Sequence, residues 1–313
     1  MAEMTWAVDV PSGVMKNRAL SEKIYAQAVA NSKLVEYATP VEGFGKKQGD
    51  TVSFKRIAGP AEPSSAKLTE GEPIPEDTTT ISTASITVSE YGRSIPYTSL
   101  MEDLADFDVN NVVQKELVKQ MTLVLDTIIA TAFKKAKVKY AVTGIAANNI
   151  ATNGTFGATS VANLNVWHLG EIRDYMYDTL FVPPIGDAYI GVFRSLALRG
   201  IKNDPDFIEW NKYTTPEKKY TGEVGMIEGI RLIEVNHSNA FGKVGTGSVL
   251  GEGVVFGDEA IALAEVLTPE LRAKIPTGYG RDLGVAWYGI LEAGLIWDTG
   301  NAGQAKILHV GSL

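Results

Sequence analysis

The sequence contains no cysteine. Disulfide bonds, thiol nucleophiles and cysteine-ligated metal sites are therefore excluded, and any added stability must come from packing or self-association. Histidine is also scarce. The three histidines, His168, His237 and His309, lie far apart, and none occurs in H-E-x-x-H or another metal-ligand spacing. We therefore expect no metal and no cofactor.

Positive charge is in short supply. The chain has 29 lysines and arginines against 37 aspartates and glutamates, a formal net charge of -8. A protein that binds nucleic acid by neutralising phosphates needs a basic surface, so tight, direct binding of DNA or RNA is disfavoured. An acidic wall around packed DNA is physically reasonable, because repulsion keeps the polymer from sticking to its container.

No long uninterrupted apolar run is present. The most apolar stretch near the end, residues 283–297, is broken by Glu292 and by glycines, which indicates buried strands rather than a membrane span. The first ten residues lack the basic region and apolar core of a secretory signal. We therefore expect no membrane association, and synthesis in the cytoplasm.

Motifs that carry chemistry are missing as well. The glycines of residues 245–253 fit neither a phosphate loop nor a dinucleotide fingerprint. Ser64 and Lys67 have the spacing found in penicillin-binding enzymes, but the companion motifs are absent. Carboxylate pairs such as Asp204 and Asp206 are better explained by a helix stop, and Asp103, Asp106 and Asp108 by helix starts. The sequence therefore predicts a protein that is not an enzyme.

Residues 43–97 form the most informative segment. Residues 51–57 predict a strand with Val52 and Phe54 on one face, and residues 83–89 alternate between apolar side chains and serine or threonine. Between them, residues 59–80 are rich in proline, glutamate, serine and threonine. So long a loop is rare inside a compact domain, and an isolated two-stranded ribbon is marginal in water. The segment is thus either disordered or a projecting ribbon held from outside its own domain, and the alternation favours the ribbon.

The preceding and following segments predict helices. Residues 1–16 indicate an extended arm, and residues 17–37 an amphipathic helix. Ser99 and Glu102 match a capping box that opens a short helix. Asp106 or Asp108 then caps a long helix to about residue 137, apolar on more than one face and so buried on most sides. Lysines 134, 135, 137 and 139 complement the dipole at its end on a solvated surface.

The rest of the chain predicts an α/β unit followed by strands. Residues 140–160 indicate a hairpin with loops. The later elements are a helix over 163–179, a strand over 187–193, a helix over 194–202 stopped at Asp204-Pro205, strands over 229–235 and 253–256, a short helix over 258–263, and strands over 264–271, 285–295 and 305–310.

Two stretches carry a resemblance to a known family. The first is Leu68-Thr-Glu-Gly-Glu-Pro-Ile-Pro-Glu, followed by Ile86-Thr-Val-Ser-Glu-Tyr-Gly and by Tyr97-Thr-Ser-Leu-Met-Glu-Asp before the long helix. The second is Thr221-Gly-Glu-Val-Gly-Met-Ile-Glu-Gly-Ile-Arg-Leu-Ile-Glu. With the order of elements from about residue 52 to 260, they resemble major capsid proteins of tailed bacteriophages with the Hong Kong 97-type fold, of the N4-like branch.

The resemblance implies an α+β fold with five parts. Residues 1–48 would be an N-terminal arm with a helix, and residues 49–97 an extended β-loop lying over a neighbouring subunit. Residues 98–159 would be a peripheral domain with a long spine helix, residues 160–262 an axial α/β domain, and residues 263–313 terminal strands that return to the peripheral domain.

It also implies partners and contact residues. Subunits would form pentamers and hexamers of an icosahedral virion capsid, with portal, scaffolding and decoration proteins as further partners, and would enclose double-stranded DNA without sequence-specific binding. Lys67 lies where some family members crosslink, but no partner asparagine can be assigned, so no crosslink is predicted. The extended loop would contact a neighbour through Phe54, Arg56, Lys67, Leu68, Glu70, Glu72 and Ile74.

Two other functions stay open at this point. An encapsulin-like nanocompartment would keep the fold and hold a cargo enzyme instead of DNA. A soluble hydrolase would use a pocket in residues 160–260, but it would require a nucleophile–base pair that the sequence does not show.

Overall fold

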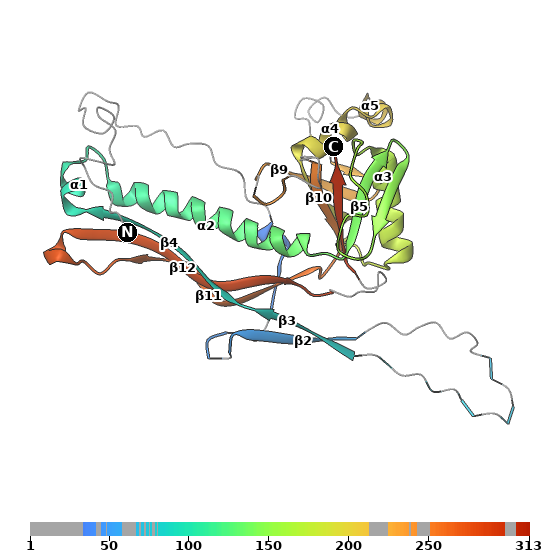
Figure 1. The fold of residues 1–313 in the computed structure, drawn as a ribbon, viewed down its shortest axis with the longest axis horizontal. Coiled ribbons are helices and arrows are strands. Elements are labelled where there is room, and N and C mark those ends of the chain that lie inside the picture. The colour runs from blue at the N-terminus through green and yellow to red at the C-terminus, as the bar shows by residue number, and fades with distance from the viewer. Residues whose placement is uncertain are drawn as a thin grey trace.

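The computed structural model describes residues 34–41, 45–47, 49–57, 67–68, 70–71, 73–74, 76, 79, 81–212, 225–237, 239–242, 251–297 and 305–313. They form an α+β fold, as expected from the sequence. One part is elongated, with a long helix lying on long strands. The other is a seven-stranded sheet with helices, and it lies at the C-terminal end of that helix (Figure 1).

The elongated part consists of helix α2 (Val109–Lys134) on a four-stranded sheet. Its strand order is β1-β11-β12-β4, and the strands span Thr39–Pro40, Ile261–Ala273, Asp282–Leu295 and Ser89–Thr98. Trp287 is buried between sheet and helix, in one cluster with Val113 and Leu117. Although α2 is long, no helix in the described part of the chain combines the length and apolar content that crossing a membrane would need.

Both helices at the far end of this part begin with a capping side chain. Helix α1 (Ser99–Leu104) is capped by Thr98, whose Oγ1 accepts a hydrogen bond from the Met101 amide at 3.3 Å. The predicted cap at Ser99 is therefore wrong by one residue. Asp108 caps α2, accepting from the Asn111 amide at 3.1 Å, which decides between the two predicted caps.

The second part is a sheet with strand order β6-β5-β13-β10-β7-β9-β8. Helix α3 (Val166–Asp174), a π-helical turn (Tyr175–Thr179) and α4 (Ser195–Lys202) pack into one core cluster with it, while the end of α2 belongs to a second cluster on the sheet. The strands span Ala147–Ala151, Val138–Gly144, Ile307–Ser312, Gly251–Phe256, Tyr189–Arg194, Ile230–Val235 and Met226–Ile227.

The position of β13 corrects the expected return of all residues after 263 to the long helix. β13 lies between β5 and β10 in the middle of the seven-stranded sheet. All six of its residues are buried, so the strand is covered on both faces, as expected for a central strand of a sheet. Strands β5 and β6, expected within residues 98–159 beside the spine helix, belong to this sheet too.

Several predicted helix boundaries are wrong for local reasons. Residues 258–263 form no helix, because the chain turns at Glu259 (φ 49°) and enters β11 at Ile261. The predicted end of the helix over 194–202 is confirmed, because α4 ends at Lys202, and Pro205 then begins a separate helix, α5 (Pro205–Lys212), since proline fits the first helical position. The long helix ends at Lys134, not near 137. Of the predicted helix over 17–37, a 3₁₀ turn is found at Val35–Tyr37, and residues 17–33 lie outside the described residues.

Candidate self-assembly interface

A two-stranded ribbon projects from the elongated part (Figure 1). It consists of β2 (Thr51–Ile57) and β3 (Ile81–Thr87), paired antiparallel from Thr51 opposite Thr87 to Ile57 opposite Ile81. Exposure alternates along both strands, as the sequence pattern predicted. The ribbon therefore has one solvated face and one face turned to the body.

The base of the ribbon rests on its own subunit. Ile86 is 4% exposed and forms a small cluster with Ala262 and Ala264 of β11, against which Phe54 packs. The guanidinium of Arg56 donates a hydrogen bond to the Ile296 carbonyl at 3.3 Å. Two of the predicted neighbour-contacting residues, Phe54 and Arg56, thus contact their own chain, and their contact with a neighbour stays a prediction.

Beyond Arg56, the side chains at the outer end of the ribbon are exposed. Ile57 and Ile81, the last pair before the loop, are each 61% exposed. Beyond them Leu68 is 56% and Ile74 72% exposed, and Lys67 and Glu70 are exposed as well. Glu72 lies outside the described residues. Full burial of a leucine or isoleucine is worth about 1.5–3 kcal/mol, so the tip offers apolar surface that a partner can cover.

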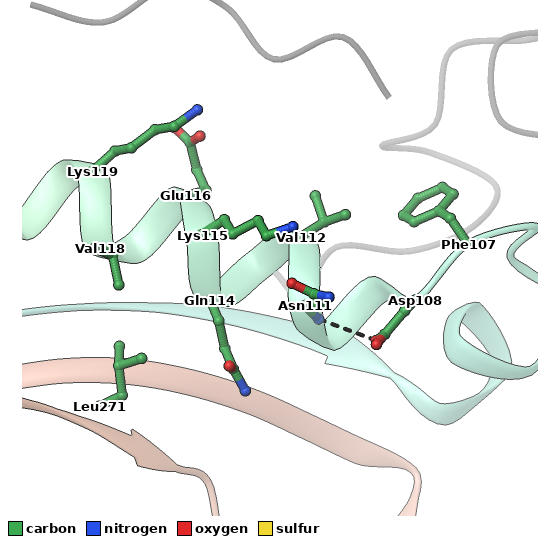
Figure 2. A pocket seen from close by; sticks show the side chains of 10 residues that line it. All are labelled: Phe107, Asp108, Asn111, Val112, Gln114, Lys115, Glu116, Val118, Lys119 and Leu271. Atoms are coloured by element: carbon green, nitrogen blue, oxygen red, sulfur yellow. Dashed lines mark hydrogen bonds between the residues drawn. The ribbon is translucent and has the colours of Figure 1, made fainter. Parts of the chain in front are cut away.

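A groove runs beside the first half of α2, lined by that helix and by Leu271 of β11 (Figure 2). It has a volume of about 650 Å³. Leu271 of β11 faces it because that residue pairs with Trp287, whose side chain packs towards α2. Val118 comes from the helix, and Lys115 and Lys119 supply charge. It is an open surface groove with mixed polarity, and none of its residues forms a nucleophile–base pair.

Among the described residues, a linked set of charged and polar side chains lies where α2 ends on the seven-stranded sheet. Glu252 Oε1 is 2.8 Å from His309 Nε2, and His309 Nδ1 is 2.8 Å from Lys139 Nζ. Glu252 Oε2 is 3.3 Å from Lys134 Nζ and accepts a hydrogen bond from the Gly242 amide at 2.6 Å. We call this set the buried network; its members are Lys134, Lys139, Glu252 and His309.

The environment shifts the pKa of three members. Burial lowers the pKa of Lys139 to about 8, against the opposing charge of Glu252. Burial also lowers the pKa of His309, and the charge of Lys139 adds to this. Burial alone would raise the pKa of Glu252, but hydrogen bonds from His309 and the Gly242 amide bring it below its ordinary value.

Sequence reasoning missed the buried network. It placed Lys139 on a solvated surface at the helix end, whereas Lys139 is buried in β5 and its Nζ donates to the Lys134 carbonyl at 2.7 Å. The available signal was a charged or polar residue inside each of three apolar runs, at positions 139, 252 and 309. Such residues are almost never fully buried unless paired.

The other residues considered for catalysis or metal binding have structural roles in the described part of the chain. Asp204 accepts hydrogen bonds from the amides of Val166 (2.9 Å) and Asp206 (3.0 Å), so it caps local structure. His168 is buried between the Tyr140 hydroxyl and the Gly144 carbonyl. Among the residues described, no three histidine or carboxylate side chains gather as metal ligands would. Ser64 and residues 243–250 lie outside the described residues.

Comparisons with known proteins give a clear result for the fold. No protein-family model and no curated protein matches the chain. Among solved structures, a chain of the cyanophage Pam1 capsid matches with a TM-score of 0.69, covering 98% of this chain and 99% of that one at 16% identity. The capsid of Helicobacter pylori bacteriophage KHP30 gives 0.69, with 94% of each chain covered at 13% identity. The capsid of cyanophage P-SCSP1u gives 0.67, with 95% and 93% covered at 10% identity. The chain therefore has the fold of phage capsid chains.

Proposed function

We propose that this chain is the major capsid protein of a tailed bacteriophage, and that copies of it close an icosahedral head around double-stranded DNA. The observation that carries the proposal is the reach of the structural match. About 98% of this chain aligns with about 99% of a capsid chain, so the likeness extends over the whole of both folds. The projecting ribbon is the feature that self-association explains best.

The mechanism is assembly. The ribbon leaves the body with exposed Ile57 and Ile81 at its outer end, and a neighbouring copy would cover them. Such a contact joins different surfaces of two copies, and heterologous contacts of this kind close into rings when the rotation fits. Many contacts per subunit make the shell stable even where each one is weak.

Finer assignments belong to the same proposal. The elongated part would be the peripheral domain with α2 as its spine, and the seven-stranded sheet with its helices the axial domain around five- and six-fold axes. The motifs at residues 68–76 and 221–234 favour the N4-like branch. Portal, scaffolding and decoration proteins would be further partners, synthesis would be cytoplasmic, and the chain would have no enzymatic activity. The net charge of -8 suits a wall that encloses DNA without binding it tightly.

Deletion of residues 59–80 tests the role of the ribbon. We expect folded subunits, because the ribbon base keeps its own core contacts, but no closed particles in negative-stain images. In a matched variant, a glycine-serine chain of equal length replaces the same residues. This variant keeps the length of the loop but removes the side chains of the tip, and it should also fail to form shells. Normal particles from either variant would refute the role of the tip.

The content of native particles separates the remaining functions. Phage DNA inside purified particles supports the capsid, whereas a protein cargo without DNA would support an encapsulin-like compartment. A small, uniform oligomer that hydrolyses a substrate would instead support the hydrolase.

A further inference from the structure

The buried network connects two parts of the fold that no strand pairing joins directly. Lys134 is the last residue of α2, Glu252 lies in β10, and His309 lies in β13. Lys139 of β5 donates back to the Lys134 carbonyl, at the end of the helix where carbonyl groups lack helical partners. The network thus fastens the end of the long helix to three neighbouring strands.

The pattern of donors and acceptors fixes the protonation state in which the network holds together. The ionised carboxylate of Glu252 can only accept, so His309 Nε2 must donate to it. The ammonium group of Lys139 can only donate, so His309 Nδ1 must accept. Both bonds form only when His309 is neutral, with its proton on Nε2.

A proton added to His309 breaks this pattern. Nδ1 would then carry a hydrogen that points at the ammonium group of Lys139, 2.8 Å away, and two donors and two positive charges would face each other. Glu252 favours the added proton, but the other close neighbours of His309, the ring of Phe156 and the charge of Lys134, offer no acceptor for a hydrogen on Nδ1.

We propose that the buried network is an acid-sensitive latch, which holds the C-terminal end of α2 against the seven-stranded sheet and releases it when His309 takes up a proton. The other charged groups on this side do not reverse the effect. His237 faces Asp126, Arg194 and Lys134, and it also loses charge by burial. The inference does not rest on the proposed function, since it concerns one subunit.

The sign of the pH dependence follows from the shifts. His309 has a pKa below its ordinary 6.5, so the unfolded or opened chain binds more protons as the pH falls below about 6.5, and the closed form loses stability there. The pKa of Glu252 is also lowered, so its contribution is lost in the same direction, below about pH 4.5. The latch is therefore closed at neutral pH and opens in mild acid.

Hydrogen exchange of the unassembled full-length chain tests the latch. The reporters are the amides of Lys135 and Ala136, which end α2, and of Gly242, which donates to Glu252. After correction for intrinsic exchange, we expect their protection to fall between pH 7.5 and 5.5, by at most about tenfold per pH unit, because one proton is taken up.

His309→Gln should abolish the fall in protection below pH 6.5. Its side-chain amide can donate to Glu252 and its oxygen can accept from Lys139, but it gains no proton in this range. His168→Gln is the matched control, because His168 is also buried in hydrogen bonds but lies outside the network. In that control the three reporters should keep the wild-type pH dependence. Equal pH dependence in wild type and His309→Gln, or its loss in His168→Gln, would overturn the proposal.

Lys139→Met provides a second route that does not require the glutamine variant to fold. Without the ammonium group, a protonated His309 meets no second donor and keeps its bond to Glu252. The reporters should then be less protected at both pH values, because the Lys134 carbonyl loses its partner, but protection should no longer fall with acid. Wild-type pH dependence in Lys139→Met would count against the latch.

Discussion

Two isoleucines in strand β3 allow the two halves of the ribbon to be tested separately. Ile86 is 4% exposed and packs on Ala262 and Ala264, while Ile81, five residues earlier, is 61% exposed. Gly294 makes room for Ile86, since a Cβ atom at position 294 would lie 2.6 Å from Ile86 Cγ1. The same substitution, isoleucine to alanine, therefore removes a buried anchor at one position and exposed surface at the other.

Ile86→Ala should loosen the ribbon within one subunit. Buried isoleucine-to-alanine changes cost about 2–5 kcal/mol, and we expect the low end, about 2 kcal/mol, because this small edge cluster can collapse into the gap. A loss of about 2 kcal/mol corresponds to roughly 30-fold faster exchange of amides that open with the ribbon. Hydrogen exchange of the peptides covering β2 and β3 measures it.

Ile81→Ala should leave the subunit nearly unchanged and reduce assembly. An exposed substitution stays within about 0.5 kcal/mol, so exchange in β2 and β3 should change by less than about threefold. On the proposed function, however, a neighbour covers Ile81 in the shell, and the yield of closed particles counted by negative stain should drop. Equal exchange in the two variants would refute the anchoring role of Ile86. Wild-type particle yield from Ile81→Ala would refute the contact at the outer end.

Two further pairs of variants test how the helices are built. Asp108→Ala removes the cap of α2 and should cost about 1 kcal/mol, seen as faster exchange in its first turn. Asp106→Ala, in the same connection and exposed, should have no such effect. Gly200→Ala should destabilise by about 1–3 kcal/mol and lower Tm, because a Cβ atom there would meet the Leu164 carbonyl oxygen. At Gly170 an added Cβ atom meets nothing within 4 Å, so Gly170→Ala should stabilise α3 by up to about 1 kcal/mol. A lower Tm in Gly170→Ala, or an unchanged Tm in Gly200→Ala, would contradict this packing.

The parts of the fold that could be predicted from sequence are those set by local periodicity. The alternation through Ala84 and Ile86 predicted a strand with one buried face, and β3 has that face against the body. The apolar stripes of the long helix predicted burial on several sides, and α2 packs on both the long strands and the seven-stranded sheet. Such patterns can be read from the sequence because they depend only on which face of a helix or strand is buried.

The errors arose where long-range pairing decides. Periodicity did not predict β4, because residues 89–98 have no clean alternation. Their strand is stabilised by ten residue pairs with β12. The apolar run of β13 predicted a strand. It did not predict which sheet contains that strand, because more than one sheet could bury it. The buried network depends on β5, β10 and β13 being neighbours, so no spacing in the sequence could show that residues 139, 252 and 309 meet.

The way the ribbon joins the body explains how a contact made far from the core can influence the whole subunit. Only Val88 separates β3 from β4, so the strand that forms the ribbon continues into the sheet beneath α2. From Ser89 opposite Leu291 to Thr98 opposite Asp282, β4 is paired with β12 along its full length. A contact at the ribbon therefore acts on a strand that continues into one paired with β12 along its full length, and the cluster around Ile86 holds the base of the ribbon on β11. Because α2 packs on β12 and ends at the buried network, this helix connects the strands that continue from the ribbon to the seven-stranded sheet.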